Sequence, residues 1–80
     1  MHTDDQIIEL FRAAVKEVDG KDLGAITRET EISDLGLDSV MTMEVIGVLE
    51  EKLDMRFPDE DLATLKRIGD LTTLVRKMAA

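Results

Sequence analysis

The 80-residue sequence contains no cysteine, no tryptophan, no tyrosine and only one proline. Without cysteine the chain can form neither disulfide bonds nor thiolate-ligated zinc sites. No apolar run approaches the ~20 residues that a membrane-spanning helix needs. The first residues, which include Asp4 and Asp5, are polar and acidic, unlike a signal peptide. We therefore expect residues 1–80 to form one soluble cytoplasmic domain, a monomer with a small apolar core.

The negative charge of the chain is concentrated in its middle. Residues 31–61 contain ten acidic and two basic residues, a net charge of −8, whereas the remainder contains eight of each. Such a segment repels nucleic-acid backbones and anionic membranes and attracts basic protein surfaces. We therefore expect protein partners with basic patches, and neither nucleic acid nor membrane. The alternative is that these acids only keep the protein soluble.

Capping residues and apolar periodicity predict the first helix and the segment that follows it. Thr3 and Gln6 have the spacing of a capping box, and apolar residues then recur every three or four positions. Gly20 is a typical stop for such a helix. Between residues 20 and 38 no helical period persists, yet apolar residues recur. We expect a long ordered loop there, with a short turn near residues 32–35.

Three more helices are predicted in the rest of the chain. The second runs from about residue 38 or 39 to Leu53, and a short third helix begins at Pro58 and ends near residue 65 or 66. The last starts near Arg67 and has apolar positions at Ile68, Leu71, Leu74, Val75 and Met78. We expect an all-α fold, a small four-helix bundle with three main helices, one short third helix and a long ordered loop between the first two.

The second helix is apolar on two faces. One stripe can point into the core and consists of Val45, Ile46, Leu49 and Leu53. The other stripe consists of Val40, Met43 and Gly47. A helix that is apolar all round is normally buried on all sides, which so small a protein can hardly arrange. We interpret the second stripe as an exposed docking surface with adaptable methionine; the alternative is that Met41 and Met43 fill gaps in the core.

The start of the second helix carries a candidate modification site. Ser39 lies at a helix N-terminus, where free backbone N–H groups and the positive end of the helix dipole stabilise an anion. A phosphate ester on Ser39 would lie in that field. Asp38, directly before it, could help a modifying enzyme to hold a divalent cation. The alternative is that Asp38 and Ser39 are ordinary helix-capping residues.

The residues around Ser39 resemble a known family. Segment 35–40, Leu-Gly-Leu-Asp-Ser-Val, is similar to the phosphopantetheine attachment region of acyl carrier proteins, and the similarity continues at Glu44, Ile46, Leu49, Glu50, Glu51 and Leu53. Segment 57–62, Phe-Pro-Asp-Glu-Asp-Leu, resembles the approach of that family to its short third helix. The resemblance extends over nearly the whole chain.

The resemblance implies that the chain is a carrier protein and not an enzyme. A phosphopantetheinyl transferase would attach 4′-phosphopantetheine from coenzyme A to Ser39, with Asp38 as the contact for the transferase's magnesium. The terminal thiol of the arm would hold acyl groups as thioesters, so the chain needs no cysteine of its own. Basic patches of the transferase, the loading enzyme and synthase components would dock on the second helix at Val40, Met43, Glu44, Glu50 and Glu51.

Departures from the family pattern bear on the pathway. Leucine is commoner than Val40 after the serine, carriers of fatty-acid synthesis usually have an acid in place of Met41, and the last helix often starts at Ser or Thr instead of Arg67. These differences favour a polyketide-type or other specialised pathway over general fatty-acid synthesis. Aminoacyl carriers usually have two glycines before the residue preceding the serine, so Gly36-Leu37 fits the acyl type better; an aminoacyl or peptidyl carrier remains the alternative.

Three rival classes explain less of the sequence. A calcium-binding protein is suggested by the spacing of Asp19, Gly24 and Ile26, but an EF-hand would need oxygen ligands at Lys21, Leu23 and Thr30. An acidic helical interaction module without a prosthetic group leaves the placement of Asp38-Ser39 as coincidence. An enzyme is the least expected class, because His2 is the only histidine and no lysine, histidine or second carboxylate near Ser39 in the sequence could activate its hydroxyl.

Overall fold

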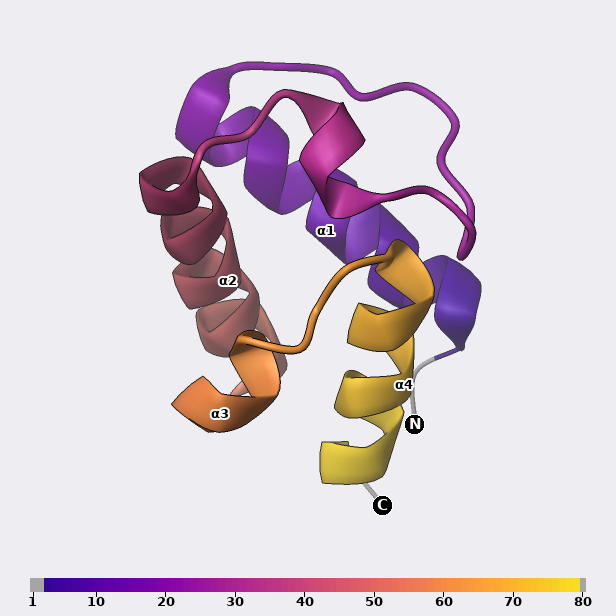
Figure 1. Cartoon of the computed structure of the whole chain (residues 1–80), viewed down its shortest axis with the longest axis vertical. Helices are drawn as coiled ribbons and strands as arrows, with labels where there is room; N and C mark the ends of the chain where they lie inside the picture. Colours follow the sequence, from indigo (N-terminus) through magenta and orange to yellow (C-terminus); the bar gives the residue numbers. More distant parts are fainter. Residues whose placement is uncertain (1–2, 80) are drawn as a thin grey trace.

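A computed structural model describes residues 3–79 of the chain (Figure 1). Over these residues there are four α-helices and one 3₁₀-helix, and the only strand-like pairing is an isolated bridge between Glu31 and Arg67. The elements in chain order are α1 (Asp4–Asp19), the 3₁₀-helix η1 (Ile32–Leu35), α2 (Ser39–Leu53), α3 (Asp59–Leu62) and α4 (Ile68–Ala79). The expected all-α architecture, with three main helices and a short third one, is confirmed.

The predicted caps of α1 are present. The Thr3 hydroxyl accepts a hydrogen bond from the Gln6 N–H at 3.2 Å, and the Gln6 side chain accepts one from the Thr3 N–H at 2.9 Å. This reciprocal capping box satisfies two N–H groups that the helix itself cannot. At the other end Gly20 has a φ of 69°, in the left-handed region that glycine adopts without strain, and its N–H donates to the Lys16 carbonyl.

The core lies where α1 packs against both α2 and α4 (Figure 1). Its fully buried apolar side chains are Ile7, Phe11, Ala14, Val15, Val45, Leu49, Ile68, Leu71 and Val75. All four residues of the predicted inner stripe of α2 are buried, so the rotation of this helix about its axis was predicted correctly.

Two residues of α4 differ from the apolar pattern. Met78, which the pattern places in the core, is 39% exposed, because the last turn of α4 extends past the part of α1 that covers the helix (Figure 1). Thr72, which the pattern leaves outside, is fully buried, and its hydroxyl donates a 3.0 Å hydrogen bond to the Gly69 carbonyl. That bond allows a polar side chain to be buried without an unsatisfied group.

Helix α3 is shorter than the sequence predicts. It ends at Leu62, and the residues after it form turns whose hydrogen bonds run from the Thr64 N–H to the Asp61 carbonyl and from the Leu65 N–H to the Leu62 carbonyl. The carbonyl of the next residue, Lys66, accepts a bond from a distant part of the chain. The N–H groups of Thr64 and Leu65 donate to the residue three positions back instead of four, so the α-helix ends and the chain turns toward this long-range contact at Lys66.

That contact is one of three backbone hydrogen bonds that join the long loop to the start of α4. The N–H of Ile32 donates to Lys66, that of Ile68 donates to Thr30, and that of Gly69 donates to Arg28, each at 2.9 Å. We call these three bonds between residues 28–32 and 66–69 the backbone bridge. It orders the end of the loop without any regular strand, and so the expected ordered loop is confirmed.

A side chain adds to the same connection. Arg28 donates to the Asp4 carboxylate at 2.7 Å and to the Thr73 hydroxyl at 3.1 Å. Arg76 reaches the same carboxylate at 3.3 Å. These contacts tie the loop to the first turn of α1 and to the outer face of α4.

The start of α4 is capped by an acid that sequence reasoning missed. Arg67 is the residue before the helix, and its side chain has no oxygen that could accept a hydrogen bond from the first N–H groups of α4. Instead one oxygen of the Asp70 carboxylate accepts hydrogen bonds from the N–H groups of Lys66 and Arg67, each at 3.0 Å. In a capping box, the side chain of the third helical residue accepts a hydrogen bond from the backbone N–H of the residue before the helix, and Asp70 makes this half of the motif. The hydrogen bond from the Arg67 N–H, and to a smaller extent the one from the Lys66 N–H, lowers the pKa of Asp70 below its ordinary value of 3.8.

This lowered pKa predicts part of the acid sensitivity of the fold. A carboxylate whose pKa is lower in the folded state stabilises the protein above its unfolded pKa, and the contribution is lost as the pH falls through the folded value. Asp70→Asn keeps an oxygen acceptor but cannot titrate. From about pH 6 to below about pH 3, the urea midpoint of Asp70→Asn should therefore fall less than that of the parent. An equal fall of the urea midpoint in the two proteins would mean that the Asp70 carboxylate does not contribute to the acid sensitivity.

Candidate functional site

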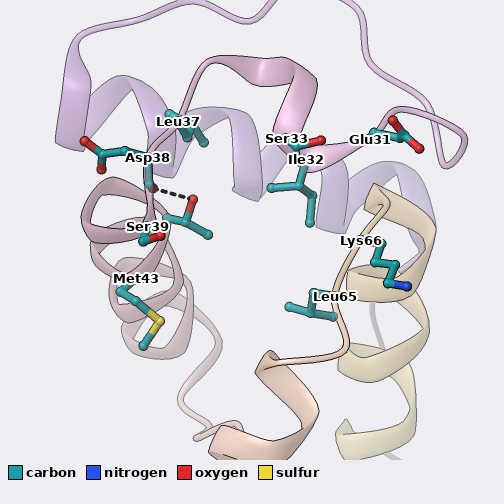
Figure 2. Close-up of a pocket in the computed structure, with 10 residues that line it drawn as sticks. Glu31, Ile32, Ser33, Leu37, Asp38, Ser39, Met43, Leu65 and Lys66 are labelled. Atoms are coloured by element: carbon teal, nitrogen blue, oxygen red, sulfur yellow. Dashed lines mark hydrogen bonds between the residues drawn. The ribbon is translucent and has the colours of Figure 1, made fainter.

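Ser39 is the first residue of α2 and is exposed to solvent. Asp38 caps the helix: its carboxylate accepts a hydrogen bond from the Met41 N–H at 2.8 Å. Its carbonyl accepts bonds from the Thr42 N–H at 2.9 Å and from the Thr42 hydroxyl at 2.8 Å. In Figure 2 the dashed line at this helix end marks the hydroxyl bond, and none reaches Ser39. Asp38 and Thr42 thus fix the helix start and leave the Ser39 side chain accessible.

The main chain around Ser39 suits an attached phosphate. The N–H groups of Ser39 and Val40 lie in the first turn of a 15-residue helix, where no intrahelical acceptor exists for them. They and the helix dipole favour a negative group at this end. One oxygen of the Asp38 carboxylate is engaged by Met41, and a carboxylate has a second oxygen with which it can contact a cation. The site therefore fits the phosphopantetheine that the sequence pattern implies.

A surface groove of about 480 Å³ begins at Ser39 (Figure 2). Its walls are the segment around η1, the first turns of α2 and the connection between α3 and α4. The apolar lining residues are Ile32, Leu37, Met43 and Leu65, and the polar ones besides Asp38 and Ser39 are Glu31, Ser33, Thr42 and Lys66. In Figure 2 Ile32 and Leu65 point into the same space from opposite walls. The groove can therefore accommodate a flexible chain that is attached to the serine.

The approach to the site is held by Gly36 and Lys21. Gly36 follows η1 with a φ of 76°, a conformation in which a side chain would be strained. A β-carbon at this residue would also lie only 2.8 Å from the Lys21 ammonium. That ammonium donates a 2.6 Å hydrogen bond to the Leu35 carbonyl. The loop is thereby fixed just before the chain turns into α2.

The outward face of α2 carries most of the predicted docking residues. Val40 is 67% exposed and Met43 is 54% exposed, and Glu44 and Glu51 are exposed beside them. Met43 therefore does not fill a gap in the core, whereas Met41 is half-buried.

Glu50 differs from the other two glutamates. It is half-buried, and its carboxylate accepts a 2.8 Å hydrogen bond from the Phe57 N–H. Glu50 thus holds the chain where it leaves α2 toward α3, a structural contact that the sequence did not reveal.

Sequence reasoning also missed the groove-lining residues that lie outside the α-helices. Ile32, Ser33, Leu65 and Lys66 come from two segments more than thirty residues apart, which the backbone bridge brings together. The recurring apolar residues in the irregular segments were the only available signal, because they showed that these segments fold onto the core.

Metal-binding clusters and membrane-spanning helices are both absent from the described part of the chain. Among residues 3–79, no three His, Cys, Asp or Glu side chains lie close enough together to bind a metal ion. No helix in this part of the chain is long and apolar enough to cross a membrane. His2 lies outside the described residues.

Comparison with known proteins identifies the family of the chain. The family described as "Phosphopantetheine attachment site" matches residues 9–75. An acyl carrier protein of Rhodococcus erythropolis is 34% identical, covering 99% of this chain and 88% of that protein. One of an Exiguobacterium species is 39% identical, covering 91% and 94%. The meromycolate extension acyl carrier protein of Mycobacterium leprae is 35% identical, covering 95% of this chain and 67% of that protein.

A solved structure shares the fold. The acyl carrier protein of Thermotoga maritima superposes with a TM-score of 0.87 at 26% sequence identity, covering 95% of this chain and 89% of that one. The family match spans most of the helical fold, and its description names a prosthetic group, phosphopantetheine. A plain interaction module would have no such group. Together with the exposed serine at the start of α2, these similarities show that the chain belongs to the acyl carrier protein family and contains its phosphopantetheine attachment domain.

Proposed function

We propose that this protein carries acyl intermediates as thioesters on a 4′-phosphopantetheine arm attached to Ser39 and presents them to biosynthetic enzymes. The observation that carries the proposal is an exposed serine hydroxyl at the N-terminus of α2, at the mouth of a groove, in a chain of this family. When bound, the arm supplies the thiol on which an acyl group is held.

The residues of the chain have distinct parts in this function. The Ser39 hydroxyl provides the oxygen to which the arm is joined. Asp38 keeps the first turn of α2 in place through Met41 and offers a carboxylate to the magnesium ion of the transferase. The first-turn N–H groups stabilise the phosphate. The apolar groove walls, Ile32 and Leu65 among them, limit the contact of the attached chain with water.

We further propose that the pathway is of the polyketide or another specialised type. Met41 stands where carriers of general fatty-acid synthesis usually have an acid, and Val40 stands where leucine is commoner. Some of the similar proteins are named for one particular use, meromycolate extension. The mass of the group loaded on natively purified protein will distinguish a fatty acyl, a polyketide and an aminoacyl cargo.

Incubation with a phosphopantetheinyl transferase, magnesium and coenzyme A tests the attachment. The intact mass should rise by one phosphopantetheine and by no more, because one serine of this type is present at a helix start. A chain that is fully folded by circular dichroism and gains no mass would refute the proposal.

The acids of α2 give a prediction about partner docking. Glu44 and Glu51 are exposed on the same face as Val40 and Met43. Glu44→Lys combined with Glu51→Lys should slow arm transfer mainly by reducing the association rate, because rim charges act on that rate. The difference from the parent should shrink as salt is added, since the screening length is about 8 Å at 0.15 M ionic strength.

A matched control separates docking from net charge. Asp5→Lys combined with Asp19→Lys changes the net charge of the protein by the same amount but lies on α1, where both side chains are exposed. This control should be modified at nearly the parental rate. If both double variants slow transfer equally, the attraction depends on the net charge of the protein and not on α2. If neither slows transfer and the parent shows no salt dependence, the acids of α2 serve only solubility.

A further inference from the structure

A short link, residues 36–38, joins the end of η1 to Ser39. Leu35 before the link is buried, and Leu37 within it is half-buried and packs against the core. Among the described residues, one hydrogen bond joins Leu35 or the link to a distant part of the chain. It runs from the Lys21 ammonium to the Leu35 carbonyl at 2.6 Å. The direction in which the chain enters α2 therefore depends on this polar contact and on apolar packing.

The main chain on both sides of Lys21 is tied to α1. Gly20, directly before it, donates its N–H to the Lys16 carbonyl at 2.8 Å. Asp22, directly after it, accepts a bond from the Arg12 guanidinium at 3.4 Å. The ammonium of Lys21 is thus carried by the well-anchored end of α1, from which it reaches the approach to Ser39.

The Leu35 carbonyl needs a donor from outside η1. Leu35 is the last residue of that helix, and the last carbonyls of a helix have no partner within it. Lysine is a suitable donor there, because a charged donor forms a stronger hydrogen bond than a neutral one. Gly36 leaves the necessary space, since a β-carbon at this residue would lie 2.8 Å from the Lys21 nitrogen. Lys21 and Gly36 therefore form a single contact that fixes where the link begins.

We propose that Lys21 is a positioning residue for arm transfer, because its bond to the Leu35 carbonyl keeps Asp38 and Ser39 in the arrangement that the transferase uses. The inference rests on the proposed function. In the transfer, the Ser39 oxygen forms a bond to the phosphorus of the phosphopantetheine group of coenzyme A. The bond from that phosphorus to adenosine 3′,5′-bisphosphate breaks, and a base of the transferase accepts the hydroxyl proton.

Such a reaction is sensitive to position. The attacking oxygen, the phosphorus and the leaving oxygen must lie roughly in line, and a misplacement of about 1 Å can cost about 100-fold in rate. Asp38 is the residue where the link meets α2, and its carboxylate accepts the Met41 N–H at 2.8 Å. Without the Lys21 contact, the link moves and this cap is open for part of the time. The transferase then meets a smaller fraction of competent molecules, which raises the apparent KM.

Substitutions at Lys21 test the proposal. Lys21→Met keeps most of the side-chain length but removes the donor, and kcat/KM for arm transfer should fall about fivefold, mainly through KM. Lys21→Arg retains a charged donor and should keep most of the parental rate. The Tm of both variants should stay close to that of the parent, because Lys21 is exposed.

Two controls separate position from charge and from stability. Lys16→Met removes the same charge from an exposed residue in the last turn of α1. Val75→Ala removes fully buried atoms from α4 and lowers the Tm. Both should accept the arm at the parental rate at a temperature where they are folded. Transfer at the parental rate in Lys21→Met, or equal slowing in Lys21→Met and either control, would overturn the proposal. A failure of the proposed function differs, because the parent itself would then gain no arm.

Hydrogen exchange measures the positioning without the transferase. The Met41 N–H is bonded to the Asp38 carboxylate, and the Gln6 N–H is bonded in the same way to the Thr3 hydroxyl at the start of α1. In Lys21→Met the Met41 hydrogen should exchange with water at least about twofold faster than in the parent, whereas the Gln6 hydrogen should not change. Unchanged exchange at Met41 would show that the Asp38 cap does not depend on Lys21, and the assignment would be wrong.

Discussion

Ser39→Ala should abolish the gain of one phosphopantetheine that the parent shows with transferase and coenzyme A. Alanine has no oxygen to which the arm can be joined, so the loss should be complete and not merely a slower rate. The exposed side chain of Ser39 makes no contact that the core needs, and surface substitutions of this kind change stability by about 0.5 kcal/mol or less. Intact mass and circular dichroism of the same sample will show an unmodified and folded protein.

The chain provides its own matched control. Ser33 is the only other serine, is exposed, and lines the same groove in η1. Ser33→Ala removes a hydroxyl near the site without touching the start of α2, and it should be modified like the parent. A mass gain that persists in Ser39→Ala would place the attachment elsewhere, and loss of the gain in Ser33→Ala would point to Ser33.

Leu49→Ala should cost about 2–5 kcal/mol of unfolding free energy, a large share of what so small a domain has. Leu49 is fully buried in the face of α2 that packs against α1, and α1 cannot move in to fill the space without losing its contacts with α4. The loss therefore includes both the transfer of the side chain from water and the cavity that remains.

Met43→Ala on the same helix is the matched comparison. Met43 is 54% exposed, so its truncation should cost less than about 1 kcal/mol. Urea unfolding of both variants at neutral pH gives the two values directly. Similar losses would mean that α2 is rotated about its axis relative to the structure described above.

The long helices could be predicted from the sequence because their signals are local. The capping box of Thr3 and Gln6 fixes the start of α1, and Gly20 fixes its end. In α2 the inner stripe is apolar at helical spacing, and the acids Glu44 and Glu51 mark the opposite face, so Leu49 and Met43 could be assigned to different environments. Periodicity and caps require no knowledge of the rest of the chain.

The features that could not be predicted depend on contacts between distant segments. Just after α3 ends at Leu62, the pairing of Lys66 with Ile32 across the backbone bridge joins segments for which no local sequence pattern predicts contact. The groove is missed for the same reason, because Leu65 lines it from the other side of that bridge. Met78 is an apolar position of α4 and is nevertheless exposed, because periodicity shows which face of a helix is apolar but not how far its neighbour extends.

The backbone bridge also has a consequence for how carriers of this kind can diversify. It fixes the spacing of two groove walls with main-chain N–H and carbonyl groups, which every residue type except proline can provide in full. The side chains on those walls, such as Ser33 and Lys66, take no part in those bonds. Mutations can therefore alter the polarity of the groove while its width stays constant. A lineage can acquire a new cargo preference in small steps, none of which requires the scaffold to be rebuilt.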